Sequence, residues 1–523
     1  MSDVLESTVE EPTDSFDQPP RPRRGGALAF VLAAGVGAAL VFLLVKDSLT
    51  DDAYITLAYA RNVATDLHWG LIPQEVSNSA TSPLNILLLA LSMTVLSVFG
   101  EVRPVLGLGA LTVGLTMITA WGWVGIVRAL RLPLAAAAVG VTVMLLNPFV
   151  LSAIGLEVVL IPTVLTLLVI TALKRRPVWF GIVSALAIMT RLDLVVFVLA
   201  VAFGTAAIRR RLHVAVIAAI VVAAPWYVFS WLTLGSAVPD TLVIKTTQPG
   251  LFGEWSFVTG PIMYFIGQPL AVGIAFLPAA LGAIAVVGWL TMHFAVRWDG
   301  TSPVATLAPA AALGFGGIAY YVVYSLMGVG PYHWYFVPPI VSLSMFLAVA
   351  VGAWLSGARR EAWLRAGTAA TALGIVGLLA AGTLAVDLRQ GVPWKSPIIF
   401  GNWASAHDYA AVGVALRDRV GDATVQSPGE IGTLAFYCEC AIVDEFSDRG
   451  RVLEKVNRAI DGSGGLVNLG LRANYANLDR TIPPRPIDYR LEYASGPATG
   501  PDSWTVFSAA KGVGHFTLVP AAG

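Results

Sequence analysis

The sequence predicts a polytopic α-helical membrane protein whose chain ends in a smaller domain of α/β type. Of its 523 residues, 56% are hydrophobic and only 13% are charged, with a mean hydropathy of +0.73. Soluble proteins are nearer half apolar and a quarter charged. Apolar runs of roughly 20 residues, the length that crosses a bilayer, recur up to residue 386. Residues 387–523 instead carry mixed charge with many prolines and glycines.

The elements are expected in the following order. Residues 1–26 are acidic and proline-rich and cannot bury a core, which predicts a disordered cytoplasmic tail. Residues 27–386 are expected to form the transmembrane domain, with about eleven spans. The predicted spans cover residues 27–45, 84–99, 104–127, 133–149, 150–173, 178–208, 213–234, 262–290, 303–327, 336–355 and 367–386.

Basic residues predict the orientation of these spans. Arginines before residue 27 favour a cytoplasmic N-terminus, so the loop 46–83 is expected on the outer face. Arg209–Arg211, Arg297, Arg359, Arg360 and Arg365 then fall inside, as the positive-inside rule asks. Counting five spans between residues 84 and 208 places Arg128, Arg131 and Lys174–Arg176 outside, against the rule. A multi-pass plasma-membrane protein with an extracytoplasmic C-terminal domain is expected.

Other classes of protein are excluded by composition. Lys and Arg together number 33, as do Asp and Glu, so the chain offers no basic excess for binding nucleic acid. The cysteines are Cys438 and Cys440 alone, and the six histidines are scattered. A disulfide-built fold and a histidine or cysteine metal site are therefore not expected.

The segment 387–523 is predicted to be an extracytoplasmic domain. Residues 407–420 have a helical pattern, and alternating runs at residues 423–427 and 441–443 indicate strands. A small α/β-type domain, followed by irregular β structure, fits this order.

The predicted outer loop 46–83 contains the strongest candidate for chemistry. Asp51 and Asp52 open a run in which apolar residues recur at helical spacing from Tyr54 to Ala64, which predicts an amphipathic helix along the membrane surface. Two acids at the start of a helix suit its N-terminus, so an N-cap is one interpretation. The other is a general base at the membrane interface. Thr81 and Ser82, just before Pro83, read alone as helix caps.

Ionisable residues inside apolar runs are costly and are treated as site candidates. Glu157 lies in one such run, and Arg191 and Asp193 lie in the next; an alternative is that they form a structural ion bridge. Lys245 is the lone cation of the predicted loop 235–260, and His333 lies among aromatic residues in another short loop.

These segments together carry a resemblance. Asp-Asp-Ala-Tyr-Ile followed by Tyr-Ala-Arg-Asn, then Thr-Ser-Pro-Leu, Gly-Leu-Glu, Arg-x-Asp and Gly-x-x-x-Pro-Asp-Thr with a following Lys, resemble the GT-C glycosyltransferases. They resemble in particular the actinobacterial enzymes of cell-wall arabinogalactan and lipoarabinomannan assembly that use polyprenyl-phosphate sugars, such as the terminal β-arabinofuranosyltransferases. The tail segment Ile431–Tyr437 with Ile442–Asp444 is similar to the extracytoplasmic domain of that group.

The resemblance implies a GT-C-like fold and a mechanism. The donor would be a sugar on polyprenyl phosphate, and the acceptor an envelope polysaccharide. Asp51 or Asp52 would deprotonate the acceptor hydroxyl, and Lys245 would bind the donor phosphate. The remaining substrate-binding candidates are Arg61, Arg191, His333, Glu157, Asp193, Tyr54, Thr81 and Ser82. No metal or other cofactor is predicted, since side-chain cations can balance one phosphate.

Two features depart from the family pattern, and alternatives stay open. Residues 66–77 lack the Gly-rich Asn-Pro-Gly motif that is common in this family. The segment Thr56-Leu-Ala occupies a position at which family members often have a bulky basic or aromatic residue. Arabinofuranose is the favoured sugar, with a mannosyltransferase as the alternative. A transporter of lipid-linked sugars or a glycan-binding scaffold is a further hypothesis; transporters often show repeated halves, which this sequence lacks.

Overall fold

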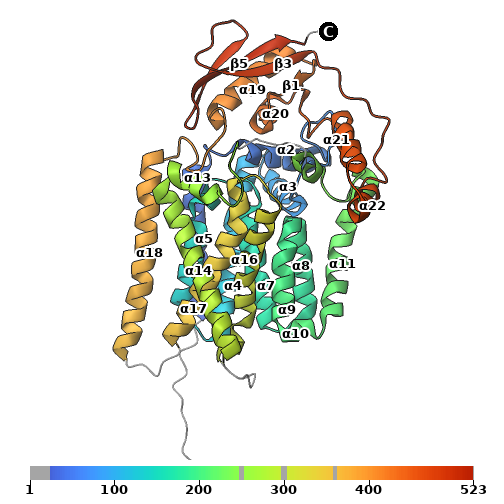
Figure 1. Ribbon diagram of the computed structural model, residues 1–523. Helices are drawn as coiled ribbons and strands as arrows, with labels where there is room; N and C mark the ends of the chain where they lie inside the picture. The colour runs from blue at the N-terminus through green and yellow to red at the C-terminus, as the bar shows by residue number, and fades with distance from the viewer. Residues whose placement is uncertain (1–23, 247–252, 296–302, 357–361, 522–523) are drawn as a thin grey trace, which may run out of the picture.

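The structure is a computed structural model that describes residues 24–246, 253–295, 303–356 and 362–521. A bundle of long apolar helices carries a small domain on one end, referred to here as the domain end (Figure 1). Most of the tail expected over residues 1–26, together with Arg297, Arg359 and Arg360, lies outside the described residues.

The bundle is built from these helices. They are α1 (Arg24–Val45), α2 (Asp51–Asp66), α3 (Pro83–Ser97), α4 (Pro104–Leu130), α5 (Leu134–Leu145), α6 (Pro148–Leu151), η1 (Glu157–Val159), α7 (Leu160–Leu173), α8 (Pro177–Thr190), η2 (Leu192–Leu194), α9 (Val195–Gly204), α10 (Ala206–Arg209), α11 (Leu212–Phe229), η3 (Ser230–Leu234), α12 (Thr241–Thr246), α13 (Gly260–Gly267), α14 (Pro269–Ala295), α15 (Pro303–Thr306), α16 (Ala308–Leu326), η4 (His333–Phe336), α17 (Val337–Ser356) and α18 (Ala362–Gln390).

Several of these helices can span a membrane. Among the described residues, six are long and apolar enough by length and composition: α1, α4, α11 with η3, α14, α16, and η4 with α17. Shorter apolar helices of 10–17 residues, α5, α7, α8 and α9 among them, pack between these. The prediction of a polytopic helical membrane protein is confirmed.

Helix α3 corrects the predicted path. Gly109 of α4 lies against the ring of Phe42 near the end of α1, and Gly35 lies against Met117 further along, so α1 and α4 are antiparallel. Helix α4 therefore starts at the domain end, where α3 also begins after α2. The prediction that residues 84–99 span the bundle is wrong: Met93 in the later part of α3 packs against Gly107 near the start of α4, so the helix stays near the domain end.

The run 178–208 is a second correction, because it folds as two helices, α8 and α9, joined at residues 191–194. Residues 84–99 therefore no longer count as a span, and the run 178–208 counts as two. The loops that contain Arg128, Arg131 and Lys174–Arg176 then lie on the opposite side from the one predicted. Gly122 and Gly125 of α4 face Thr166 and Ile170 of α7, so these helices run in parallel away from the domain end. Gly181 of α8 lies against Ala215 of α11. Arg128, Arg131 and Lys174–Arg176 therefore share the end opposite the domain with Arg209–Arg211.

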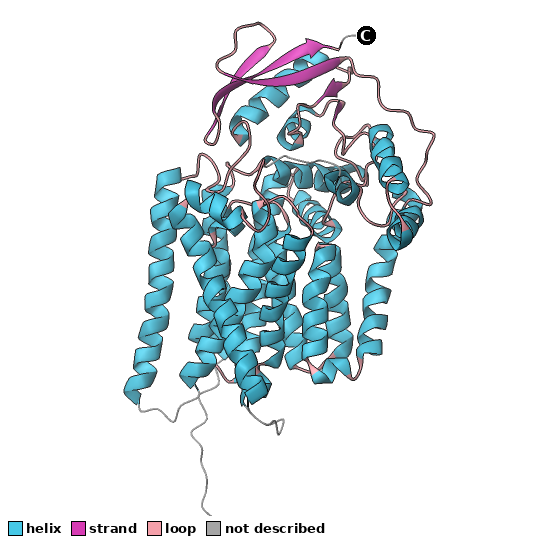
Figure 2. Ribbon diagram, in the orientation of Figure 1, coloured by secondary structure: helices cyan, strands magenta, loops and turns pink. Residues whose placement is uncertain are grey.

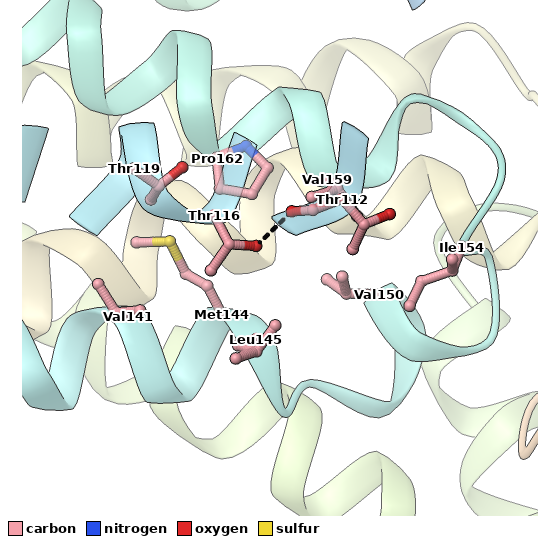
Figure 3. A pocket seen from close by; sticks show the side chains of 10 residues that line it. All are labelled: Thr112, Thr116, Thr119, Val141, Met144, Leu145, Val150, Ile154, Val159 and Pro162. Atoms are coloured by element: carbon pink, nitrogen blue, oxygen red, sulfur yellow. Dashed lines mark hydrogen bonds between the residues drawn. The ribbon is translucent and has the colours of Figure 1, made fainter. Parts of the chain in front are cut away.

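The bundle interior is closely packed. A cavity of about 20 Å³ lies between α4, α5 and α7, lined by Thr112, Thr116 and Thr119 and by apolar side chains (Figure 3). The Thr116 hydroxyl donates to the Thr112 carbonyl oxygen at 2.8 Å, and Thr119 donates to the Leu115 carbonyl at 2.9 Å. A cavity of this size holds about one water molecule, so it cannot admit a sugar.

The C-terminal domain is of α/β type, as predicted (Figure 2). Its elements are α19 (Ala406–Val420), β1 (Val425–Gln426), α20 (Gly432–Cys438), β2 (Ile442–Val443), α21 (Arg449–Asp461), α22 (Gly465–Asn474), β3 (Tyr489–Ser495), β4 (Ser503–Ser508) and β5 (Gly512–Pro520). The strand order is β2-β1-β3-β5-β4; β1 is parallel to β2 and β3, and the rest pair antiparallel. The helix expected over residues 407–420 and the first two strands are confirmed. Cys438 and Cys440 form a disulfide.

The path of α3 predicts which positions share a side of the membrane. Single cysteines at Glu101, after α3, and at Asp461, in the C-terminal domain, should react with an impermeant maleimide from the same side. A cysteine at Lys174 should react only from the other side. All three positions are solvent-exposed, and the native cysteines are held in a disulfide. Labelling of residues 101 and 174 from one side would contradict this path.

Candidate functional site

Helix α2 lies across the domain end, between the bundle and the C-terminal domain (Figure 1). Nine of its 16 residues are buried, including Tyr54, Leu57 and Tyr59. The helix predicted from Tyr54 to Ala64 is present and lies across the end of the bundle, but the side expected to face water is covered by α20 of the C-terminal domain. Tyr54 packs against Phe436 and Tyr437, with ring centroids 5.5 and 5.9 Å apart.

Asp51 joins the two domains. Its carboxylate accepts hydrogen bonds from the backbone N–H groups of Gly432 at 2.9 Å and Thr433 at 2.7 Å, where α20 begins. Burial raises the pKa of Asp51, although these hydrogen bonds oppose the rise. A Cβ at position 432 would lie 2.0 Å from the Asp51 carbonyl oxygen, so only glycine allows this approach. Both carboxylate oxygens of Asp51 are thus engaged in holding the C-terminal domain.

Asp52 is placed differently. Within the described part of the chain, its carboxylate accepts no hydrogen bond from another residue. Burial raises the pKa of Asp52 to about 6, with Asp51 and Glu157 adding to the rise and the Lys245 charge opposing it. A partly buried carboxylate with free oxygens and a pKa near neutrality can accept a proton from a substrate.

Lys245, on α12, supplies the cation whose charge acts on Asp52. Its ammonium donates to the Tyr335 hydroxyl at 3.2 Å and lies 4.6 Å from the ring centroid of Tyr332. Burial by itself lowers the pKa of Lys245, but Tyr335, Tyr332 and Asp52 outweigh that effect and raise it. The side chain is therefore a cation at neutral pH, without a carboxylate ion pair among the described residues.

A buried ion cluster adjoins this lysine. The Arg191 guanidinium donates to Glu157 at 2.6 Å and to Asp193 at 2.6 Å. The Tyr320 hydroxyl also donates to Asp193, at 3.1 Å, as does Tyr324. Arg191 lies 4.9 Å from the ring centroid of Tyr335, which also binds Lys245. Two carboxylates already balance the charge of Arg191, which is the structural ion bridge considered as the alternative.

Two loops hold α12 in place. The side-chain amide of Asn78 donates to the carbonyl oxygen of Ser236 at 2.8 Å, and the Asp240 N–H donates to the carbonyl of Asn78 at 2.9 Å. Thr241, at the start of α12, donates to the carbonyl oxygen of Ser79. The loop that follows α2 and the helix that carries Lys245 are therefore fastened together.

The other candidates are spread around this centre. Arg61 donates to Glu439 at 2.8 Å and stacks on Phe436, so it joins α2 to the C-terminal domain. His333 is buried beside Trp334 and Phe149. Thr81 is exposed, whereas Ser82 is buried just before α3.

Sequence reasoning missed Tyr320 and Tyr324, which complete the surroundings of Asp193. Their spacing of four residues on α16 places both rings on one helix face, a signal present in the sequence. Tyr335 was considered only as part of an aromatic segment.

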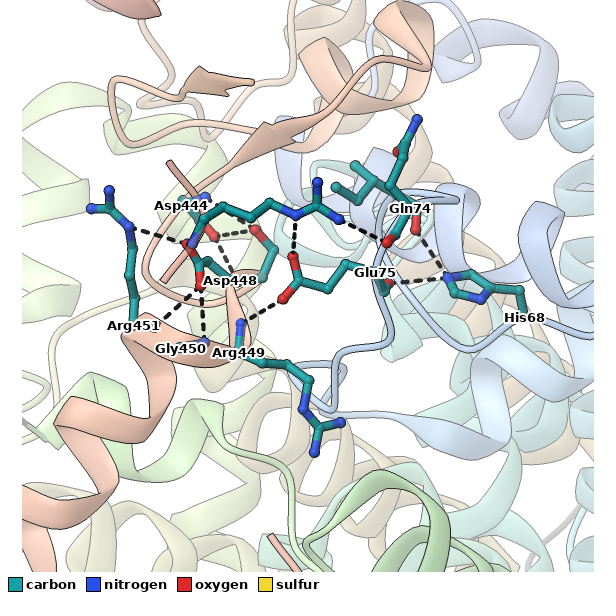
Figure 4. A network of polar contacts seen from close by, with 11 residues as sticks. His68, Gln74, Glu75, Asp444, Asp448, Arg449, Gly450 and Arg451 are labelled. Atoms are coloured by element: carbon teal, nitrogen blue, oxygen red, sulfur yellow. Dashed lines mark hydrogen bonds and ion pairs between the residues drawn. The ribbon is translucent and has the colours of Figure 1, made fainter. Parts of the chain in front are cut away.

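It also missed a second polar seam between the domains (Figure 4). Glu75 accepts from the Arg449 N–H at 2.7 Å and from the Arg485 guanidinium at 3.0 Å. Arg485 also donates to the Gln74 carbonyl at 2.8 Å, and His68 contacts the Glu75 carbonyl at 3.0 Å. These partners are separated by more than 370 residues, which no local pattern can indicate.

Among the residues that the structure describes, no group of three or more His, Cys, Asp or Glu side chains gathers in a way that could hold a metal ion. Charge in the site is provided by Lys245, Arg191, Asp52, Glu157 and Asp193. The arrangement offers a carboxylate, Asp52, without a hydrogen-bond donor among the described residues, within electrostatic reach of a cation and near tyrosine hydroxyls that can donate hydrogen bonds.

No family model matches this sequence, and no curated protein matches it. Solved structures do share its fold. ArnT from Cupriavidus metallidurans bound to undecaprenyl phosphate superposes with a TM-score of 0.54 at 14% identity, over 94% of this chain and 98% of that one. The same protein in the apo state gives a TM-score of 0.53 at 15% identity, over 94% and 98%.

The arabinofuranosyltransferase AftD from Mycobacteria matches with a TM-score of 0.50 at 13% identity, over 94% of this chain but only 40% of its own. At these identities the likeness concerns the fold. The predicted GT-C-like fold, a polytopic helical bundle with a C-terminal domain of α/β type, is therefore confirmed.

Proposed function

We propose that this protein is an integral-membrane glycosyltransferase that moves a sugar from a polyprenyl-phosphate donor to a cell-envelope glycan. The single observation that carries the proposal is the Asp52 carboxylate, which accepts no hydrogen bond from another described residue and lies within electrostatic reach of the Lys245 ammonium at the end of the bundle. Undecaprenyl phosphate is bound by ArnT, which shares the fold. A pentofuranosyl group, arabinofuranose, is the favoured sugar, and mannose is the alternative.

In the proposed reaction Lys245 binds the donor phosphate, with Tyr335 and Tyr332 supporting the cation. Asp52 removes the proton from the acceptor hydroxyl as its oxygen attacks the anomeric carbon. The new glycosidic bond forms while the bond between the anomeric carbon and the phosphate oxygen breaks, and polyprenyl phosphate leaves as the anion. Lys245 stabilises the charge that develops on that leaving group. No metal ion is required by this scheme.

The proposed orientation places the site outside the cell. Arg128, Arg131, Lys174–Arg176 and Arg209–Arg211 share the end opposite the C-terminal domain, and basic loops stay in the cytoplasm. The domain end, with Asp52, then faces the extracytoplasmic side of the plasma membrane, and α1 begins inside.

Replacing Asp52 by Asn should lower sugar transfer by roughly 10²- to 10⁴-fold, because the general base is lost. The measurement uses purified protein in lipid with polyprenyl-phosphoryl arabinose or mannose and short arabinan or mannan acceptors. The thermal midpoint of this variant should stay close to that of the wild type. No transfer by the wild type from either donor would contradict the enzyme proposal and favour a transporter or scaffold.

Asp51→Asn is the matched variant. Asn keeps one acceptor oxygen but turns an N–H group toward Gly432 or Thr433, so about 1.5–3 kcal/mol of charged hydrogen bonding is lost. We expect a lower thermal midpoint with activity per folded molecule better retained than in Asp52→Asn. The reverse pattern, a stable and inactive Asp51 variant, would make Asp51 the base.

The dependence of kcat/KM on pH should report the ionisation of the Asp52 carboxylate. A base must be deprotonated, so kcat/KM should fall about tenfold per pH unit below a pKa of about 6 in the free enzyme. A bound donor phosphate offsets the Lys245 charge that lowers the pKa of Asp52, so the pKa seen in kcat should be higher than that in kcat/KM. A profile flat down to pH 4.5 would contradict Asp52 as the base; this pH is about 1.5 units below that pKa.

Lys245→Gln should weaken donor binding. Removing a charge-assisted contact worth about 1.5–3 kcal/mol raises the KM for the lipid donor by roughly ten- to a hundredfold. Lys245→Arg should restore most of the affinity, while the KM for the acceptor changes little. An unchanged donor KM in Lys245→Gln would contradict the phosphate role.

A further inference from the structure

We infer that helix α22 of the C-terminal domain lies in the headgroup region of the bilayer and inserts Leu466, Val467 and Leu469 into the leaflet. This goes beyond sugar transfer, because it assigns a lipid-binding surface to the domain itself. It concerns a helix that contributes no residue to the site around Asp52.

The first observation is that α22 (Gly465–Asn474) is apolar yet buries none of its residues. Leu466, Val467 and Leu469 are 85%, 63% and 65% exposed. Three large apolar side chains within four positions would cost several kcal/mol of apolar exposure in water. Most surface residues that flank them are small or polar, among them Asn468 and Arg472, so the helix is amphipathic.

The second observation fixes the position of α22 at the membrane end of the domain. The indole N–H of Trp231, just beyond α11, donates to the Ala473 carbonyl at 2.9 Å. The Val238 N–H donates to the side-chain oxygen of Asn474 at 2.8 Å. Figure 1 shows α22 directly beside the domain end of α11. Helix α22 is therefore held beside the end of the helical bundle and not beside the β-sheet of the C-terminal domain.

The third observation is continuity with a lipid-facing surface. Of the 18 residues of α11, only Ala215 is buried. Val221, Val228 and Leu232 are 67%, 51% and 60% exposed, on α11 and η3, which form a candidate span. The exposed leucines of α22 extend this apolar surface beyond the end of the span. Lipid already has to cover α11, and the same leaflet covers the adjoining helix.

Contacts of the neighbouring helix α21 also hold α22 at the end of the bundle. Helix α21 packs Val452, Val456 and Ile460 against Val243 and Ile244 of α12, with Tyr475 and Leu478 completing a separate apolar cluster. Arg472 binds Asn468 at 2.7 Å and remains exposed, where it can meet lipid phosphates. Helices α21 and α22 thus link the lipid surface to the helix that carries Lys245.

The test places a fluorescent label on single cysteines of the full chain in lipid nanodiscs. Leu469→Cys probes α22, Val221→Cys probes the middle of α11, and Val513→Cys probes the sheet, where the side chain is 47% exposed. The native cysteines are held in a disulfide and do not react. An environment-sensitive label is quenched by lipids that carry a nitroxide near the headgroup or, separately, deep in the acyl chain.

An interfacial helix lies roughly 5–10 Å into the boundary between headgroups and acyl chains. The label at 469 should therefore be quenched at least about twofold more by the shallow nitroxide than the label at 513, and less by the deep one than the label at 221. Quenching at 469 no stronger than at 513 would overturn the inference. The inference would also be overturned if, in detergent, the emission of the label at 469 shifted to the blue as the protein concentration rose. Such a shift would mean that a second copy of the chain covers α22. Neither outcome depends on sugar transfer.

Discussion

The bidentate contact between the Asp51 carboxylate and the backbone of Gly432 and Thr433 is the interaction on which the arrangement depends. A carboxylate buried at the junction of two domains is costly unless its oxygens are satisfied. Both are satisfied only when the C-terminal domain covers α2. At Asp52, one residue further on, burial raises the pKa to about 6. Asp51 thus holds the C-terminal domain in place, while the carboxylate of Asp52 accepts no hydrogen bond from another described residue.

The charges at the site divide into an ion cluster of three side chains, Arg191, Glu157 and Asp193, and a second set formed by Asp52 and Lys245. Glu157 and Asp193 hold Arg191 at 2.6 Å each, and two tyrosine hydroxyls on α16 also donate to Asp193, at the same Oδ2 that accepts from Arg191. This cluster is rigid because every polar group in it has a partner. Lys245 contacts tyrosines rather than carboxylates and keeps its charge available. A site that binds a phosphate and then releases it needs such a cation, because a paired arginine would have to break its bridge.

Contacts between α12 and its neighbours at the end of the bundle fix the position of Lys245. Asn78 and Ser79 hold the start of α12 from the loop after α2, and α21 packs on its apolar side. Glu75 joins that same loop to Arg485 of the C-terminal domain. The loop that follows α2 and the helix that carries the cation therefore belong to one network of contacts with the C-terminal domain.

The sequence by itself determined the class of protein, because hydropathy and charge depend on composition and not on folding. It also determined which acids and cations to consider, since ionisable groups in apolar runs are costly wherever they lie. Only the tertiary structure separated Asp51 from its neighbour Asp52: the carboxylate of Asp51 binds a backbone group 381 residues away, whereas that of Asp52 accepts no hydrogen bond from another of the described residues. It also kept α3 near the domain end, and so brought Arg128 and Lys174–Arg176 to the side of Arg209–Arg211. Hydropathy cannot decide this, because an apolar helix at the end of the bundle and one that spans it have similar compositions.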